Sequence, residues 1–204
     1  SMDGRVMGCM GHPAMTRATP NLDRLAAQGA LYRTFFTNNP ICCPSRSSML
    51  SGTYTHTCEA WNNFKGLRDD EPNLYTHLDK NGYRTAIYGK TDYLCGNHSI
   101  RARVGAWTRT ASIMRPTYRE PLPEVIEGNE KRVHMNDWPD VDRAVDYLHN
   151  EAKASEDPFL LYVGIRAPHP KYITSQYYLD MIDEAGVDVP PADDPTQHPV
   201  THYM

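Results

Sequence analysis

The strongest constraint on the fold is an unbroken apolar run, Phe159 to Ile165, which comes shortly after a segment with helical periodicity. Residues 137–154 carry apolar side chains at helical spacing, and Pro139 lies near their start, where proline is tolerated. A continuous apolar run fits a strand buried on both faces, as in a parallel sheet covered by helices. This order of a helix and then a strand therefore indicates a parallel sheet.

The same order occurs twice earlier in the chain. A helix between Pro20 and Gly29 is followed by an apolar, aromatic run over 30–37 that is typical of a strand. A second helix over 74–81 is followed by a strand over 83–88. Strands that alternate with helices predict an α/β fold, with a parallel sheet in an α/β sandwich.

The composition limits the classes of function. The 204 residues suffice for one domain with a core, and a net charge of −4 without a basic run argues against a nucleic-acid partner. No apolar window reaches the length of a membrane span. Five cysteines without a Cys-x-x-Cys pair indicate neither a disulfide framework nor a structural zinc site. Residues 187–204 are rich in proline and aspartate and are expected to be a linker after a folded part over 1–186.

Polar residues follow each of the three expected strands. Cys42 with Arg46 comes first, then Lys90, and then His169. Ligands of parallel sheets bind beyond the carboxyl ends of the strands. We therefore expect these side chains to converge on a single anion-binding site.

The segment around Cys42 has the composition of such a site. Pro44 suits the first position of a helix and Gly52 suits its C-terminal cap, so Cys42 is expected in a loop just ahead of the helix. There, free N–H groups and the helix dipole favour an anion, and Arg46 in the first turn offers a planar group suited to oxyanions. The alternative, a buried cysteine pair or half of a disulfide beside an ordinary turn, stays open at this point.

Residues 42–46, Cys-Cys-Pro-Ser-Arg, match the Cys-x-Pro-Ser-Arg motif of the sulfatase family. Only Cys42 is in register, because Cys43 has no proline two positions later. The resemblance extends over nearly the whole chain through three further segments, Thr19 to Ala26, Gly82 to Lys90 and Ala167 to Pro170. It implies a parallel-sheet α/β sandwich of the sulfatase and alkaline phosphatase-like type, and the hydrolysis of sulfate monoesters.

The resemblance also implies a role for each candidate residue. Cys42 would be oxidised to formylglycine by the formylglycine-generating enzyme, and the hydrated aldehyde would attack the sulfur of the ester. Arg46 would steady the hydrate, Lys90 would bind sulfate oxygens, and His169 would contact the sulfate or aid proton transfer near the leaving oxygen. A calcium ion would be held by the formylglycine at position 42 and by acidic residues expected outside this chain.

Longer stretches resemble one subgroup of the family, lysosomal enzymes that remove the 2-sulfate of uronates in glycosaminoglycans. These stretches are residues 40–46, 59–66, 89–93, 97–100 and 106–109. The expected substrate is thus a sulfated sugar or an aryl sulfate, and the expected location is the secretory pathway, lysosomal or extracellular, which an Asn-x-Ser sequon at Asn97 supports weakly. Many sulfatases carry a histidine where this chain has Asp92, and His98 is a candidate replacement.

The chain resembles a sulfatase fragment that lacks both ends, and alone it is expected to be inactive because the acidic calcium ligands are missing. Two alternatives stay open. Related folds use the same cysteine motif, so a phosphate or phosphonate monoester hydrolase is the alternative enzyme. The alternative outside catalysis is an inactive fragment that keeps the fold, in which Lys90 is a solvated loop lysine and His169 a capped loop histidine.

Overall fold

The computed structural model describes residues 3–63, 65–93, 123–169 and 171–189. The chain divides into two compact units. The first unit comprises Ser1, residues 34–126 and residues 132–174. The second unit comprises residues 2–33, 127–131 and 175–204. The candidate residues Cys42, Arg46, Lys90 and His169 all belong to the first unit.

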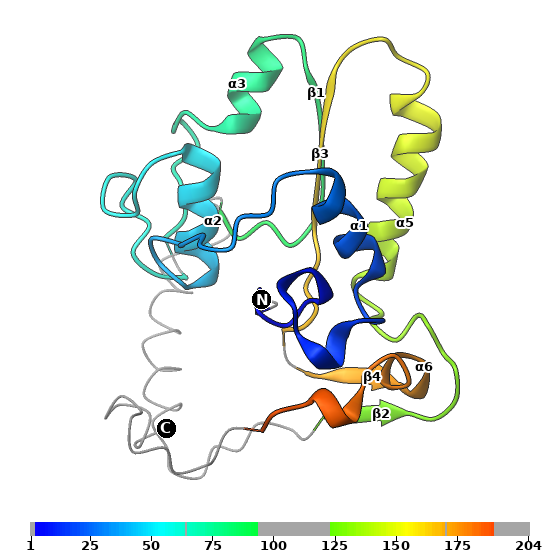
Figure 1. Cartoon of the computed structure of the whole chain (residues 1–204). Helices are drawn as coiled ribbons and strands as arrows, with labels where there is room; N and C mark the ends of the chain where they lie inside the picture. The colour runs from blue at the N-terminus through cyan, green and yellow to red at the C-terminus, as the bar shows by residue number, and fades with distance from the viewer. Residues whose placement is uncertain (1–2, 64, 94–122, 170, 190–204) are drawn as a thin grey trace. The chain divides into compact units, whose positions relative to one another are not determined.

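A pair of parallel strands forms the centre of the first unit (Figure 1). Strand β1 (Arg84–Gly89) lies beside β3 (Phe159–Gly164), in register from the first residue of each to the last. The strands predicted over 83–88 and 159–165 and their parallel order are therefore confirmed. A second pair joins the short strands β2 (Glu124–Ile126) and β4 (Ile173–Ser175).

Helices cover the central strand pair. Helix α3 (Leu74–Lys80) packs against β1, and α5 (Trp138–Tyr147) packs against both strands. Helix α2 (Cys42–Ser51) packs against α3, and Figure 1 shows α5 on one side of the strands with α2 and α3 on the other. Helix α5 continues as a π-helical turn (Leu148–Ala152), so the helix predicted over 137–154 is confirmed with a change of winding near its end.

The helix ends follow the local chemistry of the sequence. The side chain of Asn73 accepts the N–H of Thr76 at 3.1 Å, while the Thr76 hydroxyl accepts the N–H of Asn73 at 3.2 Å. This capping box satisfies two N–H groups at the start of α3. Gly52 ends α2 with a φ of 69°, the left-handed conformation that favours glycine.

The apolar core of the first unit lies between α2, α3 and β3. Its buried members are Leu50, Cys58, Ala60, Leu67, Tyr75 and Tyr93. Leu160 and Tyr162 of β3 pack against this cluster. The core thus joins the helix that carries Cys42 to the strand that leads to His169.

The strand predicted over 30–37 is wrong. These residues form neither helix nor strand, and they belong to neither of the two strand pairs in the described part of the chain. Phe35 and Phe36 are each 83% exposed. An apolar pattern forms a strand only where a neighbouring strand accepts and donates its backbone hydrogen bonds, and no such neighbour is present among the described residues. Of the three strands expected to deliver site residues, two are therefore observed.

The second unit contains α1 (Pro20–Gln28), whose predicted start and end are confirmed. Shorter turns and helices accompany it, namely η1 (Gly8–Met10), η2 (Pro13–Met15), α6 (Gln176–Leu179) and η5 (Glu184–Gly186). The carboxylate of Asp23 accepts the N–H of Cys9 at 2.7 Å and the hydroxyl of Thr19 at 3.0 Å, which ties η1 to α1. Residues 187–189 have no regular structure, and the rest of the expected linker lies outside the described residues.

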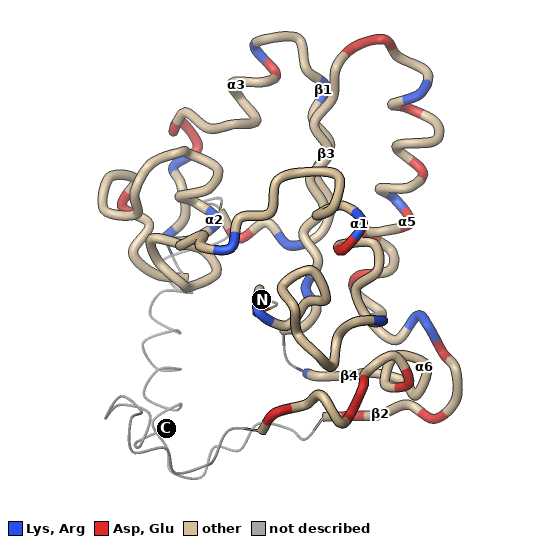
Figure 2. The backbone as a smooth tube through the Cα atoms, viewed as in Figure 1, with Lys and Arg blue, Asp and Glu red and all other residues tan. Residues whose placement is uncertain are grey.

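Charged residues of both signs are distributed along the described chain (Figure 2). No basic stretch dominates one element in this view, in agreement with the absence of a basic run in the sequence. In the part of the chain that the structure describes, no helix has both the length and the apolar character needed to cross a membrane.

Candidate active site

Cys42 is the first residue of α2, and Ile41 is the N-terminal cap. The prediction that Cys42 lies in a loop ahead of a helix starting at Pro44 is therefore wrong by two residues. Proline is tolerated at this third helical position because the first four N–H groups of a helix have no acceptor within the helix. Cys42 is half-buried and lines a cavity of about 790 Å³ together with Arg46.

The start of α2 offers fewer free donors than the sequence predicts. The N–H of Cys43 donates to the Asn63 side chain at 3.0 Å, and the N–H of Ser45 donates to the carbonyl of Ile41 at 2.9 Å. Pro44 has no N–H to donate. These three residues therefore do not form the expected set of free N–H groups, and the positive charge beside Cys42 comes mainly from side chains.

The neighbouring cysteine has a different environment. Cys43 is 0% exposed, and its sulfur lies 3.8 Å from the Ser47 hydroxyl. Burial is the main cause that raises the pKa of the Cys43 thiol to about 11. Cys9, Cys42, Cys43 and Cys58 are all free thiols, so the disulfide alternative is wrong for these four, whereas Cys95 lies outside the described residues. Cys42 is thus the more accessible sulfur of the adjacent pair.

Two glycines bring the end of β1 close to the end of β3. Gly89 has a φ of 81°, and a Cβ there would lie 2.3 Å from the carbonyl oxygen of Gly164. A Cβ on Gly164 would lie 2.1 Å from the carbonyl oxygen of Lys90. Both distances are too short for any side chain, so only glycine allows this approach. The N–H of Lys90 then donates to the carbonyl of Gly164 at 2.7 Å, which orients the residue after β1.

Lys90 points its ammonium group toward the start of α2. Its Nζ lies 3.6 Å from Cys42 Sγ and 3.3 Å from a carboxylate oxygen of Asp92. A lysine cation in this position favours the binding of an anion beside the side chain at position 42. The structure thus brings together Cys42 and Lys90, which are far apart in the sequence.

Arg46 fixes the backbone of Lys90 from the other side. Its Nη1 donates to the Lys90 carbonyl at 3.0 Å and also to the hydroxyl of Tyr162. The Tyr162 hydroxyl donates in turn to the same carbonyl at 3.3 Å. Sequence reasoning missed Tyr162, although a residue with a polar tip inside the apolar run of β3 was a signal that could have found it.

His169 lies in the loop after β3, as the sequence predicts. It lines a cavity of about 630 Å³ that is also lined by Lys90. Lys90 therefore contributes to this cavity and also approaches Cys42, which lines the other one. The structure places Cys42, Arg46 and Lys90 in one cluster and His169 beside Lys90 in the adjoining cavity.

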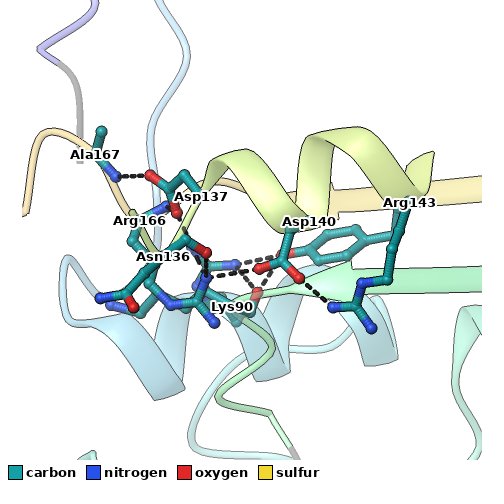
Figure 3. A network of polar contacts seen from close by, with 9 residues as sticks. Lys90, Asn136, Asp137, Asp140, Arg143, Arg166 and Ala167 are labelled. Carbon is teal, nitrogen blue, oxygen red and sulfur yellow. Dashed lines mark hydrogen bonds and ion pairs between the residues drawn. The ribbon is translucent and has the colours of Figure 1, made fainter. Parts of the chain in front are cut away.

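A network of ion pairs holds the loop between β3 and His169 (Figure 3). The carboxylate of Asp137, 5% exposed, accepts the N–H of Arg166 at 2.9 Å and the N–H of Ala167 at 2.8 Å. Asp140, on the next turn of α5, accepts from Nη1 of Arg166 at 2.7 Å and from the guanidinium of Arg143. The hydrogen bond from Arg166 is the main cause that lowers the pKa of Asp140. The sequence indicated Asp137 only as the start of a helix, because the partner loop lies about 30 residues away.

Comparison with known proteins decides the family. A family model described as Sulfatase matches residues 1–195. The chain belongs to the sulfatase family. Arylsulfatase K of Canis lupus familiaris is 39% identical and arylsulfatase K of Homo sapiens is 36% identical, each over the whole of this chain and 40% of that protein. This sulfatase chain thus spans about 40% of the length of the curated relatives it matches.

Solved structures confirm the expected fold class, the sulfatase and alkaline phosphatase-like type. A putative sulfatase from Bacteroides thetaiotaomicron matches with a TM-score of 0.58 and 24% identity, over 81% of this chain and 33% of that one. The phosphonate monoester hydrolase of Agrobacterium radiobacter matches with a TM-score of 0.66 and 18% identity, over 92% of this chain and 43% of that one. At these identities the likeness is one of fold.

The sulfatase chain does not form a calcium site from its described residues alone. Among them, no three or more histidine, cysteine, aspartate or glutamate side chains gather into a group that could hold a metal ion. Asp92 is the acid nearest to Lys90, and its carboxylate is engaged in the ion pair with that lysine. Acidic calcium ligands outside this chain therefore stay a prediction. His98, Asn97 and most of the stretch 97–109 lie outside the described residues.

Proposed function

We propose that the protein to which this chain belongs is a sulfuric ester hydrolase that acts on sulfate monoesters. The observation that carries the proposal is the approach of Lys90 Nζ to within 3.6 Å of Cys42 Sγ at the start of α2. A sulfate monoester is an anion, so its attack requires a cation beside the nucleophile. Membership of the sulfatase family supports the same reaction.

Cys42 is the proposed nucleophile after its oxidation by the formylglycine-generating enzyme. Formylglycine, when hydrated, would supply one hydroxyl that attacks sulfur while the ester S–O bond breaks and the alcohol leaves, and a second hydroxyl that loses its proton as the C–O bond to sulfate breaks and the aldehyde re-forms. Lys90 binds sulfate oxygens, and Arg46 keeps the Lys90 backbone in place while it lines the cavity with position 42. His169 contacts the sulfate or moves a proton near the leaving oxygen.

Calcium enters the proposal only through the family resemblance. Calcium binds oxygen ligands and would supply further positive charge at the sulfate. The described residues do not supply a ligand set for it, so the steps assigned to Lys90, Arg46 and His169 are those of their own side chains.

The proposed substrate class is a 2-sulfated uronate of glycosaminoglycans, because the stretches that resemble the lysosomal subgroup are long and unusual. The same resemblance supports a location of the complete protein in the secretory pathway, in the lysosome or outside the cell. The part of the chain over 1–186 is then the N-terminal part of a sulfatase catalytic domain.

The first test is the modification of Cys42. The chain is co-expressed with the formylglycine-generating enzyme, and peptide mass spectrometry compares wild type, Cys42→Ala and the matched control Cys43→Ala. We expect the aldehyde at position 42 in wild type and in Cys43→Ala, since only Cys42 lies in register with Pro44 and Arg46. An unmodified Cys42 in a protein that releases sulfate would overturn this assignment.

The second test is the choice of ester. A version of the protein extended at both ends is assayed for release of sulfate from 4-nitrophenyl sulfate and of phosphate from 4-nitrophenyl phosphate. We expect faster release of sulfate, and a lower rate for Lys90→Ala with the sulfate ester. Preferential release of phosphate would favour the monoester hydrolase alternative, and no release of either would favour an inactive protein.

A further inference from the structure

The wall of the cavity shared by Lys90 and His169 has one more cationic side chain than it has acidic ones. Its basic and imidazole side chains are Lys90, His134, Arg166, His169 and Lys171. The acidic side chains along its wall are Asp92 and Asp137. The volume of about 630 Å³ falls in the range of cavities that hold a small molecule, of about 300–1,000 Å³.

Most of these charges are already balanced within the protein. Lys90 pairs with Asp92 at 3.3 Å, and Arg166 pairs with Asp140 at 2.7 Å and with Asp137 at 3.4 Å. The oxygens of Asp137 also accept two backbone N–H groups, so this acid has little capacity left to attract a cation. Both acids on the cavity wall are therefore already engaged in ion pairs or hydrogen bonds within the protein.

Lys171 is the lysine of this cavity whose charge is not balanced by an ion pair among the described residues. It is exposed and has no acidic partner within 4.0 Å among the described residues. The carbonyl of the next residue, Tyr172, accepts the N–H of Glu124 at 2.8 Å, so the pairing of β2 with β4 fixes the backbone beside Lys171. Lys171 thus presents a positive charge from a well-anchored position.

We propose that Lys171 binds a second anionic group of the substrate, the carboxylate of an acidic sugar, while Lys90 binds the sulfate ester. The proposal rests on the proposed function and adds the residue that distinguishes a uronate from a neutral sugar. Lys171 lines the same cavity as Lys90 and His169. A cavity of this size can hold a sugar ring, so two lysines on its wall can contact two substituents of one ring. His134 lines the same cavity and can donate an imidazole N–H to the same group.

The test compares two sugars that differ in one group. Glucuronate 2-sulfate carries a sulfate and a carboxylate, whereas glucose 2-sulfate carries the sulfate alone. Binding of each to the purified chain is measured by titration calorimetry, for wild type, Lys171→Met, Lys90→Met and the control Lys153→Met. Lys153 is an exposed lysine at the end of the π-helical turn and does not line the cavity.

We expect Lys171→Met to weaken the binding of glucuronate 2-sulfate by about tenfold, the size of one charge-assisted hydrogen bond, and to leave glucose 2-sulfate unchanged. Lys90→Met should weaken both sugars, and Lys153→Met neither. Equal effects of Lys171→Met on both sugars, or none on either, would overturn the inference while the Lys90 result still supports the proposed function. Failure of wild type to bind either sugar would count against both.

Discussion

Asp137 is expected to control the loop that carries His169. In Asp137→Ala, the N–H groups of Arg166 and Ala167 lose their acceptor, and Arg166 loses one of its two acidic partners. Asp137→Asn is the conservative variant, because an amide keeps one acceptor oxygen but turns an N–H donor toward the second backbone N–H. Both variants leave the packing of α5 against the strands in place.

The expected loss of stability follows from the two backbone N–H groups that lose their acceptor. A buried donor that loses its partner costs about 1–3 kcal/mol, but Arg166 is exposed and Ala167 half-buried, so water can partly replace the carboxylate. We therefore expect Asp137→Ala to lower the free energy of unfolding by about 2 kcal/mol, and Asp137→Asn by about half as much. A loss of that size lowers the melting temperature by roughly 4–8 °C in a chain of this length.

The assay combines urea unfolding with amide hydrogen exchange. The matched control is Asp142→Ala on the same helix, whose carboxylate pairs with Arg132 at an exposed position and should contribute little. Exchange should accelerate at the amides of Arg166 and Ala167 in the Asp137 variants, and not in the control. Unfolding of Asp137→Ala within about 0.5 kcal/mol of wild type, the range of ordinary surface substitutions, would refute the argument.

Three further predictions concern reactivity, pH and metal. At a pH of about 8, iodoacetamide should alkylate Cys42 and not Cys43 in the folded chain, because Cys43 is buried and its pKa is raised to about 11. Mass spectrometry that finds Cys43 labelled in the native state would contradict this. The pKa of Asp140 is lowered in the folded state. The carboxylate should therefore stabilise the fold fully at pH values above 3.8, its ordinary pKa, and this stabilisation should decrease as the pH falls from 3.8 through the lowered pKa. Urea unfolding at a series of acidic pH values should show a shallower loss for Asp140→Asn than for wild type, and equal slopes would exclude the ion pair with Arg166 as the cause. The chain on its own should show no calcium-dependent release of sulfate, because the resemblance to sulfatases implies that the acidic calcium ligands lie outside it. Turnover that a calcium chelator abolishes would contradict this.

The local signals of the sequence predicted most of the described helices and strands. Asn73 starts α3 and Gly52 ends α2 through hydrogen bonds and backbone angles that involve only neighbouring residues. The apolar run of β3 and the helical spacing of α5 likewise reflect side chains a few positions apart. The Cys-x-Pro-Ser-Arg pattern pointed to Cys42, and comparison with known proteins confirmed the sulfatase family. Such features depend on short stretches of chain, so the sequence by itself determined them.

The tertiary structure decided the features that need two distant segments. The run over 30–37 has the composition of a strand, but a strand also requires a partner edge, and the described residues provide none. At the start of α2, the N–H of Cys43 finds its acceptor in Asn63. Tyr162 helps to orient Arg46, and Asp137 holds the loop that leads to His169. Each of these contacts joins residues at least about 20 positions apart, and no local pattern specifies which acceptor a donor will meet. Only the packing of α2, α5 and the two central strands brings these partners within hydrogen-bonding distance.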